Sequence, residues 1–290
     1  MIDLHVHSNC SDGSCSPKEL VEYAATHGIT AFALTDHDTT AGLDEAISHA
    51  KILCEKYGQT PGTNPVEVIP GIELSTEYNG RDVHIIGLFI DYQDIAFQNQ
   101  INTFMSAREE RNIKMCALFE ERGISIPYLE LKASAPGAVI TRAHYAQYLL
   151  EKGYVKSHRE AFERYLGDHA PCFVPREKVS PEQAVSLILA SHGIPVLAHP
   201  VLYHYSRIEL ETLVSRLKKA GLMAIEAIYS TYAPSDTRQM QAIAKKYDLL
   251  ISGGSDFHGA AKSGLQFGTG YGSLYVHEDV LDKLRVARPM

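Results

Sequence analysis

Histidines and acidic residues stand at or beside the ends of short apolar runs throughout this chain. His5 and His7 are two residues apart, so in a strand both side chains point to one face and can reach one cation. A carboxylate such as Glu73 or Asp256 is rarely left unpaired in apolar surroundings, and a divalent cation is a usual partner. The candidates are His5, His7, Asp36, His37, Glu73, His84, His199, Asp256 and His258. Mixed imidazole and carboxylate ligands suit Mn²⁺, Zn²⁺ or Fe²⁺, so these residues predict a metal-dependent hydrolase.

Strand-like and helix-like segments alternate along most of the chain and would position these residues. Strands are expected at residues 2–6, 31–35, 66–74, 83–89, 195–198, 223–229 and 249–253, and helices at 17–27, 41–57, 181–192, 208–220 and 235–247. This alternation predicts an α/β fold with a parallel or barrel-like sheet. Asn79 and Gly80 predict a hairpin turn, which would bring His84, at the start of its run, close to Glu73. Most other candidates end their strands, where α/β barrels have their active sites.

The middle of the chain interrupts this alternation with a helical and polar pattern. Helices are expected there at residues 101–122, 142–152 and 158–165. Because the barrel pattern resumes afterwards, we expect a helical insert that covers the barrel mouth. The predicted domains are a discontinuous barrel domain, residues 1–93 and 180–290, and an insert domain, residues 94–179.

Composition and charge exclude several other classes of protein. The 290 residues carry a formal net charge of -8 with a sequence pI near 5.9, so no global basic field is available for long double-stranded nucleic acid. The sequence shows no signal-peptide pattern and no apolar run of about 18–20 residues, so we expect a cytoplasmic protein that has no membrane partner. The five cysteines lack CxxC spacing and are expected to be free thiols.

In order along the chain, these residues resemble the motifs of the PHP (polymerase and histidinol phosphatase) superfamily. The resemblance rests on His5-Val6-His7, Asp12, Thr35-Asp36-His37-Asp38, Glu73, His84, Ala198-His199-Pro200 and Gly254-Ser255-Asp256-Phe257-His258. It covers both ends of the chain and omits only the expected insert. The resemblance implies a distorted (β/α)7 barrel, a metal-dependent phosphoesterase, and three divalent metal ions (Mn, Zn or Fe) as cofactors.

The same resemblance implies a ligand set for each ion. One ion would take His5, His7, Glu73 and Asp256, a second would share Glu73 and add His84 and His199, and a third would take Asp12, His37 and His258. Glu73, His199 and Asp256 are the expected catalytic residues. Asp36 and Asp38 are expected to orient imidazoles rather than to bind a metal.

A phosphate ester is the substrate that such a site predicts. Two cations about 3.5–4 Å apart could bridge a hydroxide, lower the pKa of its parent water to about 7, and neutralise charge on phosphoryl oxygens. The sequence has no nucleophile-elbow serine, Walker A loop or dinucleotide fingerprint. Amidohydrolase barrels also open with HxH, but a Lys usually bridges their metals. Here Glu73 takes the bridging position, and no Lys is expected at a strand end.

The insert supplies candidate phosphate anchors. Arg142 and His144 follow an apolar run, and Arg176 and Lys178 close the insert. Guanidinium groups suit bidentate contacts to phosphate, although most arginines are solvated surface charges. A PHP barrel with such an insert is similar to the group that hydrolyses nucleoside 3′,5′-bisphosphates and includes ribonucleases trimming short RNA 5′ ends (ribonuclease AM). The expected partner is therefore a small phosphorylated substrate, either a nucleotide or a short 5′-phosphorylated oligonucleotide.

One departure from that group bears on the substrate. Comparable members often read Gly-Arg after the His-Pro pair, whereas this chain has Val201 and Leu202. If the missing arginine grips a phosphate, Arg207 or a residue of the insert must replace it. A histidinol-phosphatase-type phosphomonoesterase is the alternative within the superfamily, and an amidohydrolase or a non-catalytic PHP module are the others. Tyr203, Tyr229 and Tyr232 are expected either to stack on a base or to belong to the core.

Overall fold

The computed structural model describes residues 1–57, 65–174 and 179–289. Arg176 and Lys178 lie outside these ranges, so their expected role as phosphate anchors stays a prediction. The strands are β1 (Ile2–Val6), β2 (Ala31–Leu34), β3 (Glu67–Tyr78), β4 (Arg81–Leu88), β5 (Ile194–Leu197), β6 (Ala224–Tyr229) and β7 (Leu250–Gly254). In the described ranges we find no helix with the length and apolar character that a membrane span requires.

All seven strands form one sheet in the order of the sequence, and the sheet closes on itself. The His7 N–H donates to the Phe257 carbonyl and the Asp256 N–H donates to the His5 carbonyl, each at 2.9 Å, which joins β1 to the end of β7. The expected α/β barrel is therefore confirmed. β4 runs antiparallel to both neighbours, β3 and β5, and the other pairs are parallel.

The hairpin between β3 and β4 explains this one reversed strand. Asn79 and Gly80 both have positive φ, 53° and 76°, as a type I′ turn requires. In the resulting register Ser75 pairs with His84, which brings His84 beside Glu73 although it lies near the beginning of its strand. The predicted hairpin and its consequence for His84 are confirmed.

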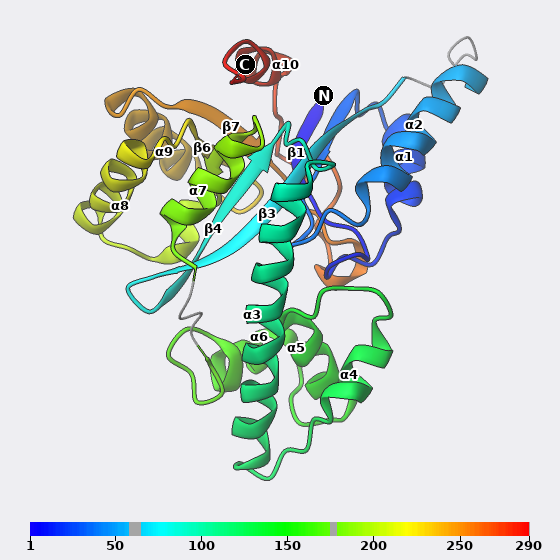
Figure 1. The fold of residues 1–290 in the computed structure, drawn as a ribbon, viewed down its shortest axis with the longest axis vertical. Helices are drawn as coiled ribbons and strands as arrows, with labels where there is room; N and C mark the ends of the chain where they lie inside the picture. The colour runs from blue at the N-terminus through cyan, green and yellow to red at the C-terminus, as the bar shows by residue number, and fades with distance from the viewer. Residues whose placement is uncertain (58–64, 175–178, 290) are drawn as a thin grey trace.

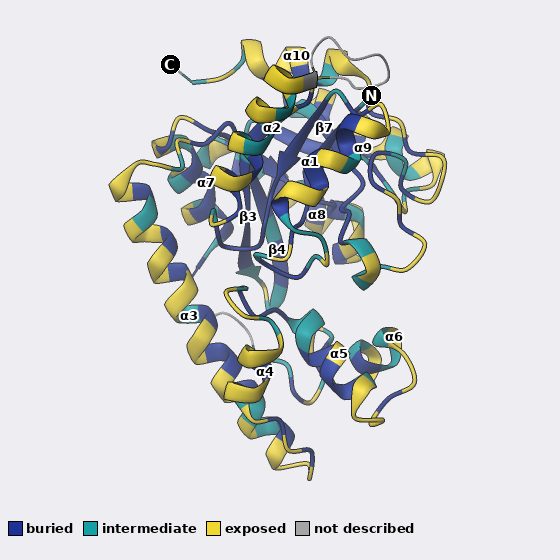
Figure 2. Cartoon of the chain, turned by 90° about the vertical axis from the view of Figure 1, so that its right-hand side faces the viewer, coloured by how far each residue is buried: buried dark blue, intermediate teal, exposed yellow. Residues whose placement is uncertain are grey.

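Helices cover the outside of the barrel (Figure 1). They are α1 (Pro17–Thr26), α2 (Leu43–Tyr57), α7 (Pro181–Ala190), α8 (Arg207–Ala220) and α9 (Pro234–Lys246). α10 (Glu278–Val286) lies across the end of the barrel opposite the insert helices (Figures 1 and 2). α1 begins as expected: the Glu19 N–H donates to Ser16 Oγ, and the Ser16 N–H donates back to the Glu19 carboxylate. Val6 packs in the apolar layer between the sheet and these helices, whereas His5 and His7 face the barrel interior.

A second group of helices lies below the barrel (Figures 1 and 2). It comprises α3 (Ile95–Glu120), α4 (Tyr128–Ser134), α5 (Arg142–Glu151), α6 (His158–Ala161) and η1 (Phe162–Leu166), and we call it the insert. The 26-residue helix α3, about 39 Å long, joins the two parts. Its first half contributes Phe97 and Phe104 to the barrel core, and its second half contributes Met115 and Phe119 to a separate insert core. We propose the domain boundaries expected from the sequence on this basis.

Candidate metal centre

Glu73, on β3, lies at the centre of a buried cluster of imidazoles. Its side chain is 1% exposed. Its Oε2 atom lies 3.4 Å from His5 Nε2, 3.2 Å from His7 Nε2 and 3.1 Å from His37 Nδ1. Burial alone would raise the pKa of Glu73, but the positive potential of the neighbouring histidines outweighs it and holds this pKa well below its usual range. Glu73 is therefore an ionised carboxylate, and its Oε2 atom faces three histidine nitrogens.

The second oxygen of Glu73 faces two further histidines. Oε1 lies 2.9 Å from His84 Nδ1 and 3.0 Å from His199 Nε2. Each carboxylate oxygen thus faces its own group of nitrogens, which is the arrangement that a bridging ligand requires.

Asp256 completes the group around His5 and His7. Its Oδ1 atom lies 3.4 Å from His5 Nε2 and 3.3 Å from His7 Nε2, and the two imidazole nitrogens are themselves 3.1 Å apart. Asp256 adopts the left-handed region with φ of 58°, an uncommon conformation for a residue other than glycine that often marks a functional site. Four potential ligands therefore converge on one point.

Asp12 and His258 form a third group at the edge of the cluster. Asp12 Oδ1 lies 3.2 Å from His258 Nε2, and Asp12 Oδ2 lies 3.8 Å from His37 Nε2. Burial opposes ionisation of Asp12, but His37 and His258 outweigh it and keep the pKa of this carboxyl well below its usual value. Thr141 of the insert donates a 2.8 Å hydrogen bond to Asp12 Oδ2.

The cluster fits divalent metal ions. All nine residues expected as ligands are brought together, and the three groups His5–His7–Glu73, His37–Glu73–His84 and His7–Asp12–His37–His258 each place their ligand atoms within 4.8 Å of one another. Asp12 Oδ1, His37 Nδ1 and His199 Nδ1 are buried, and none has a hydrogen-bond partner among the described residues. Buried polar atoms are seldom left in this state. A set of imidazole and carboxylate donors of this kind suits divalent metal ions.

A further carboxylate behind the cluster was missed by the sequence analysis. Glu226, fully buried on β6, has Oε1 3.1 Å from His5 Nδ1, and its Oε2 accepts a 2.7 Å hydrogen bond from the His199 N–H. It therefore fixes the ring of one expected ligand and the backbone of another. The sequence feature that could have indicated Glu226 is an acidic residue inside the otherwise apolar run 224–229.

Asp256 has two partners of its own. The Tyr229 hydroxyl donates to Asp256 Oδ2 at 2.6 Å, and Lys262 Nζ lies 2.5 Å from the same oxygen. Burial disfavours the charge on Lys262, but Asp256 outweighs burial and raises its pKa, so the residue stays a cation. No described strand ends in a lysine, in line with the expectation, but Lys262 reaches the site from a turn beyond β7, which was not expected.

The two acidic residues flanking His37 do not orient imidazoles directly, contrary to expectation. Asp36 accepts hydrogen bonds from the Ser8 N–H and the Ser8 and Ser11 hydroxyls, which shapes the loop after β1. Asp38 forms a buried ion pair with Arg108 of α3 and accepts from the Ser75 N–H. These contacts indicate that Asp36 holds the loop after β1 and that Asp38 holds α3 against the barrel.

A cleft between barrel and insert opens on this cluster and has two lobes. The first, about 280 Å³ and here called the cationic lobe, is lined by Asp12, His37, Ser75, Asp82, His84, Arg108, Arg111, Thr141, Arg142, Ala143, Ala146, His158, Phe162, His258, Ala261 and Lys262. The second, about 550 Å³ and here called the neutral lobe, is lined by Asn9, Ser11, Asp12, Gly13, Ser14, Ser134, Ala135, Pro136, Ala143, His144, Gln147, His158, Ala260 and Ala261. Asp12, Ala143, His158 and Ala261 line both, so the lobes meet at the cluster.

The structure separates the expected substrate residues between these lobes. Arg142 lies in the cationic lobe, where its guanidinium is 3.0 Å from Asp82 and 3.1 Å from Asp168. His144 lies in the neutral lobe and accepts a 3.0 Å hydrogen bond from the Thr141 N–H at the start of α5. Arg207 is exposed on α8 and pairs with Glu211, so it does not replace the missing arginine.

Other residues of the cleft were not expected. Arg108 and Arg111 line the cationic lobe from α3, and His158 lines both lobes. The three tyrosines considered for base stacking line neither lobe, and Tyr203 and Tyr229 are buried.

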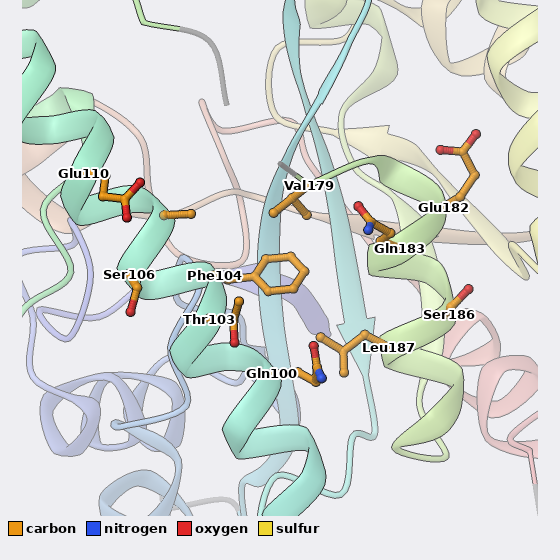
Figure 3. Close-up of a pocket in the computed structure, with 11 residues that line it drawn as sticks. Gln100, Thr103, Phe104, Ser106, Glu110, Val179, Glu182, Gln183, Ser186 and Leu187 are labelled. Atoms are coloured by element: carbon orange, nitrogen blue, oxygen red, sulfur yellow. The ribbon is translucent and has the colours of Figure 1, made fainter. Parts of the chain in front are cut away.

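A larger cavity of about 620 Å³ lies outside the site, between α3 and α7 (Figure 3). Phe104 and Leu187 point into it, and Gln183 and Glu182 stand at its edge. None of the described residues that line it is a histidine, cysteine, lysine or arginine. It contains the carboxylates Glu110 and Glu182 but no cationic side chain that could hold a phosphate.

Barrel and cluster together define a class of proteins in which a seven-stranded α/β barrel carries potential ligands for divalent metal ions at its strand ends. The PHP domain family matches residues 3–167, more than half of the chain. The chain belongs to this family.

Similar proteins cover nearly its whole length. The 5′-3′ exoribonuclease of Haemophilus influenzae is 39% identical over 88% of this chain and 89% of its own. The 3′,5′-nucleoside bisphosphate phosphatase of Chromobacterium violaceum is 32% identical over 92% and 90%. A solved structure from Chromobacterium violaceum, described as an amidohydrolase with bound sulfate and no metal, has a TM-score of 0.84 at 30% identity, covering 100% of this chain and 98% of that one. One from Bifidobacterium adolescentis, at 24% identity and a TM-score of 0.81, covers 100% and 96% and shares the fold.

Proposed function

We propose that this protein is a metal-dependent phosphoesterase that hydrolyses the 3′-phosphate ester of nucleotides carrying a 5′-phosphate. The substrate is a nucleoside 3′,5′-bisphosphate or a short 5′-phosphorylated oligonucleotide. The observation that carries this proposal is the cationic lobe, where Arg108, Arg111 and Arg142 stand beside a cluster of potential metal ligands. A substrate with one phosphate at the metals and a second phosphate among the arginines fits this arrangement.

We also propose three divalent ions with the ligands expected from the sequence. His5, His7, Glu73 and Asp256 would hold the first, Glu73, His84 and His199 the second, and Asp12, His37 and His258 the third. When bound, such ions supply an acidified water and neutralise charge on the phosphoryl oxygens. Three overlapping groups of His and carboxylate ligand atoms, each lying within 4.8 Å of one another, support the proposal of three sites.

The chain's own residues supply binding and orientation. Glu226 and Tyr229 fix the ligands from behind, so the ligand atoms are held in place before substrate arrives. Lys262 adds a fixed positive charge next to Asp256 at the wall of the cleft. The arginines of the lobe anchor the 5′-phosphate, which sets the distance to the ester that breaks.

The cationic lobe also discriminates against the alternatives. Histidinol phosphate carries an ammonium group on the carbon next to its phosphorylated CH2 and has no second phosphate, so a lobe lined by three arginines disfavours it. A neutral amide or lactone has no anionic group that could bind to the arginines of the lobe. Glu73, rather than a lysine, lies between the imidazole groups, which also disfavours the amidohydrolase alternative.

The test measures phosphate release by Mn²⁺-loaded protein from adenosine 3′,5′-bisphosphate, histidinol phosphate and a 5′-phosphorylated oligonucleotide. We expect fast hydrolysis of the bisphosphate or the oligonucleotide, and Glu73→Gln should abolish it with the fold retained. Activity on histidinol phosphate alone would contradict the nucleotide assignment.

Arg142→Ala tests the lobe itself. Loss of one charge-assisted contact of about 1.5–3 kcal/mol should raise KM for the bisphosphate about tenfold or more. Bound metal should stay the same, as measured by elemental analysis. Arg207→Ala, on the exposed face of α8, is the matched control and should leave KM unchanged. An unchanged KM in Arg142→Ala would remove the insert from the substrate site.

A further inference from the structure

Lys262 stands apart from the other cations of the cationic lobe. Arg108, Arg111 and Arg142 line the lobe from α3 and α5 of the insert. Lys262 belongs to the barrel, and no other lysine or arginine among the described lining residues does. The arginines therefore form the insert wall of the lobe, and Lys262 lies on the barrel wall together with the expected metal ligands.

The turn after β7 fixes where Lys262 lies. The Ala260 N–H donates to Ser14 Oγ at 2.8 Å, and the Ser14 N–H donates to the His258 carbonyl at 3.0 Å, so the turn is joined to the loop after β1. Gly259 at its start has a φ of 63°, a conformation that favours glycine. The backbone is therefore constrained on both sides to bring Lys262 back to the strand ends.

The contact between Lys262 and Asp256 places an ammonium group beside the first expected ion. Lys262 Nζ lies 2.5 Å from Asp256 Oδ2. The other oxygen of the same carboxylate, Oδ1, lies 3.4 Å from His5 Nε2 and 3.3 Å from His7 Nε2. One carboxylate group therefore separates the ammonium group from the point at which the expected ligands converge. A phosphoryl group bound at that point comes within reach of Nζ.

Orientation of Asp256 alone does not account for Lys262. Asp256 Oδ2 already accepts a 2.6 Å hydrogen bond from the buried Tyr229 hydroxyl, and the Asp256 N–H donates to the His5 carbonyl at 2.9 Å. The side chain of Lys262 stays 39% exposed, whereas that of Asp256 is 7% exposed. An ammonium group has three donors, and Asp256 takes one of them. Lys262 can therefore hold Asp256 and also donate to a group in the lobe that it lines.

We propose that Lys262 is a catalytic residue whose ammonium group donates a hydrogen bond to a non-bridging oxygen of the phosphoryl group that reacts. This inference rests on the proposed function. In the reaction the oxygen of water adds to phosphorus, and the bond between phosphorus and the 3′ oxygen breaks. One proton of the water ends on the departing 3′ oxygen, and the other stays on the released phosphate. Lys262 keeps its own protons and stabilises the charge that develops on the phosphoryl oxygens.

The experiment begins with Lys262→Met, which removes the charge and keeps the approximate length of the side chain. At saturating Mn²⁺ we expect kcat for adenosine 3′,5′-bisphosphate to fall about 100-fold or more, as found when one preorganised donor is removed. KM should change less than about threefold, because the contact is strongest in the transition state. Lys18→Met, at an exposed lysine of α1, is the control for the substitution and should behave as wild type.

Tyr229→Phe separates catalysis from the positioning of Asp256. It removes the other donor to the same carboxylate oxygen, from a residue that lines neither lobe. Both variants lose a partner of Asp256, but only Lys262→Met also loses the contact to the phosphoryl group. At saturating Mn²⁺ its kcat should be at least about tenfold below that of Tyr229→Phe, with bound manganese measured in both by elemental analysis. Equal kcat values, or a wild-type kcat regained as Mn²⁺ is raised, would overturn the proposal.

Orthovanadate, whose five-coordinate form resembles the transition state, gives a readout without turnover. Its Kd for the Mn²⁺-loaded protein, measured by calorimetric titration, should rise at least about tenfold in Lys262→Met and stay unchanged in Lys18→Met. An unchanged Kd in Lys262→Met would also overturn the proposal. Failure of the proposed function is distinguishable, because the wild-type protein would then leave the bisphosphate intact while the vanadate comparison would still test Lys262.

Discussion

Thr141 is the residue through which the insert contacts an expected metal ligand. Its hydroxyl donates to Asp12 Oδ2 at 2.8 Å and accepts the Ala143 N–H at 3.2 Å, so the start of α5 and the edge of the cluster share one side chain. Partners of this kind affect metal affinity by about 10–100-fold. The insert is therefore part of the metal centre as well as its cover.

Replacement of this hydroxyl should weaken one ion selectively. We expect Thr141→Val to lower the affinity for the ion held by Asp12 about tenfold or more, because Asp12 loses the donor that orients it. Thr141→Ser keeps the hydroxyl and should behave as wild type. The test is the number of manganese ions bound per protein, measured by elemental analysis after dialysis at graded metal concentrations. Equal occupancy in both variants would show that Thr141 only caps the helix.

Asp3 is a buried carboxylate that the proposed reaction does not use. It accepts hydrogen bonds from the Ser255 and Gly268 N–H groups at 2.8 and 2.9 Å. Burial raises its pKa from 3.8 to about 6, against the opposing effect of these hydrogen bonds. The folded state therefore binds the proton of Asp3 more tightly than the unfolded state does. Its favourable contribution is complete below pH 4 and is lost as the pH rises through about 6.

Asp3→Asn should remove this dependence. Between pH 4 and pH 7, the unfolding free energy of the wild type should fall by about 3 kcal/mol relative to that of the variant, at 1.36 kcal/mol per pKa unit. Urea unfolding of both proteins at several pH values measures it. A difference that stays constant over this range would show that Asp3 ionises normally.

At the level of single residues, the expected ligands could be predicted because metal ligation demands a few side-chain types at strand ends. Glu226, Arg108 and Lys262 could not be found in the same way. Glu226 and Arg108 act on residues distant in sequence, such as Glu226 on His5, 221 residues away, which only the folded chain brings together. Lys262 reaches Asp256, six residues away, through an irregular turn that the sequence pattern does not mark.

Among the elements, α3 carries the connection between barrel and insert. Arg108 at its middle pairs with Asp38, donates to the Ser75 hydroxyl at 2.8 Å, and reaches the Ile140 carbonyl. The pair is buried, with side chains 6% and 0% exposed. Removal of one partner of such a pair typically costs about 3–5 kcal/mol, because the other charge is left without compensation.

Arg108→Met should therefore destabilise the protein by about 3–5 kcal/mol, and Asp38→Asn in the same chain should restore part of the loss. Urea unfolding of both single variants and the double variant measures the coupling. Additive losses would contradict a direct interaction. The exposed pair of Lys132 and Glu109 at the insert is the control, and its removal should cost less than about 1 kcal/mol.

Most elements of the barrel could be predicted to within a few residues, since caps and turns such as Ser16 and Asn79-Gly80 are local signals. β3 continues to Tyr78, four residues beyond the expected end, because pairing with β4 supports a segment that is polar by itself. Helix α4 has only seven residues and no side-chain cap, so little in its sequence marks it. α10 was missed although its first turn is acidic and Leu281 and Leu284 are buried.

For the whole molecule, metal binding should stabilise the folded state. The ligands come from β1, β3, β4 and the ends of β2, β5 and β7, so ions bind the folded chain and not the unfolded one. An ion present at a hundredfold over its Kd adds about 2.7 kcal/mol to the unfolding free energy. At 290 residues this corresponds to about 4 °C in Tm per ion.

Chelation should therefore lower Tm by several degrees, and manganese should restore it, as measured by scanning calorimetry. Glu73→Gln, which removes the proposed bridging ligand, should show a much smaller response to chelator. A wild-type Tm that is insensitive to chelator would contradict metal binding by the folded state.

Closure of the sheet between β1 and β7 has a consequence during synthesis. His5 and Asp256, which approach each other in the cluster, are separated by about 250 residues of chain. At about 5–20 residues per second, a ribosome needs about 12 to 50 seconds to pass from one to the other. During that time the first strand has no partner on one edge, and the histidines that it carries have no matching carboxylate from β7. Until β7 is synthesised, chaperones and free metal ions therefore meet a nascent chain that carries only part of the ligand set.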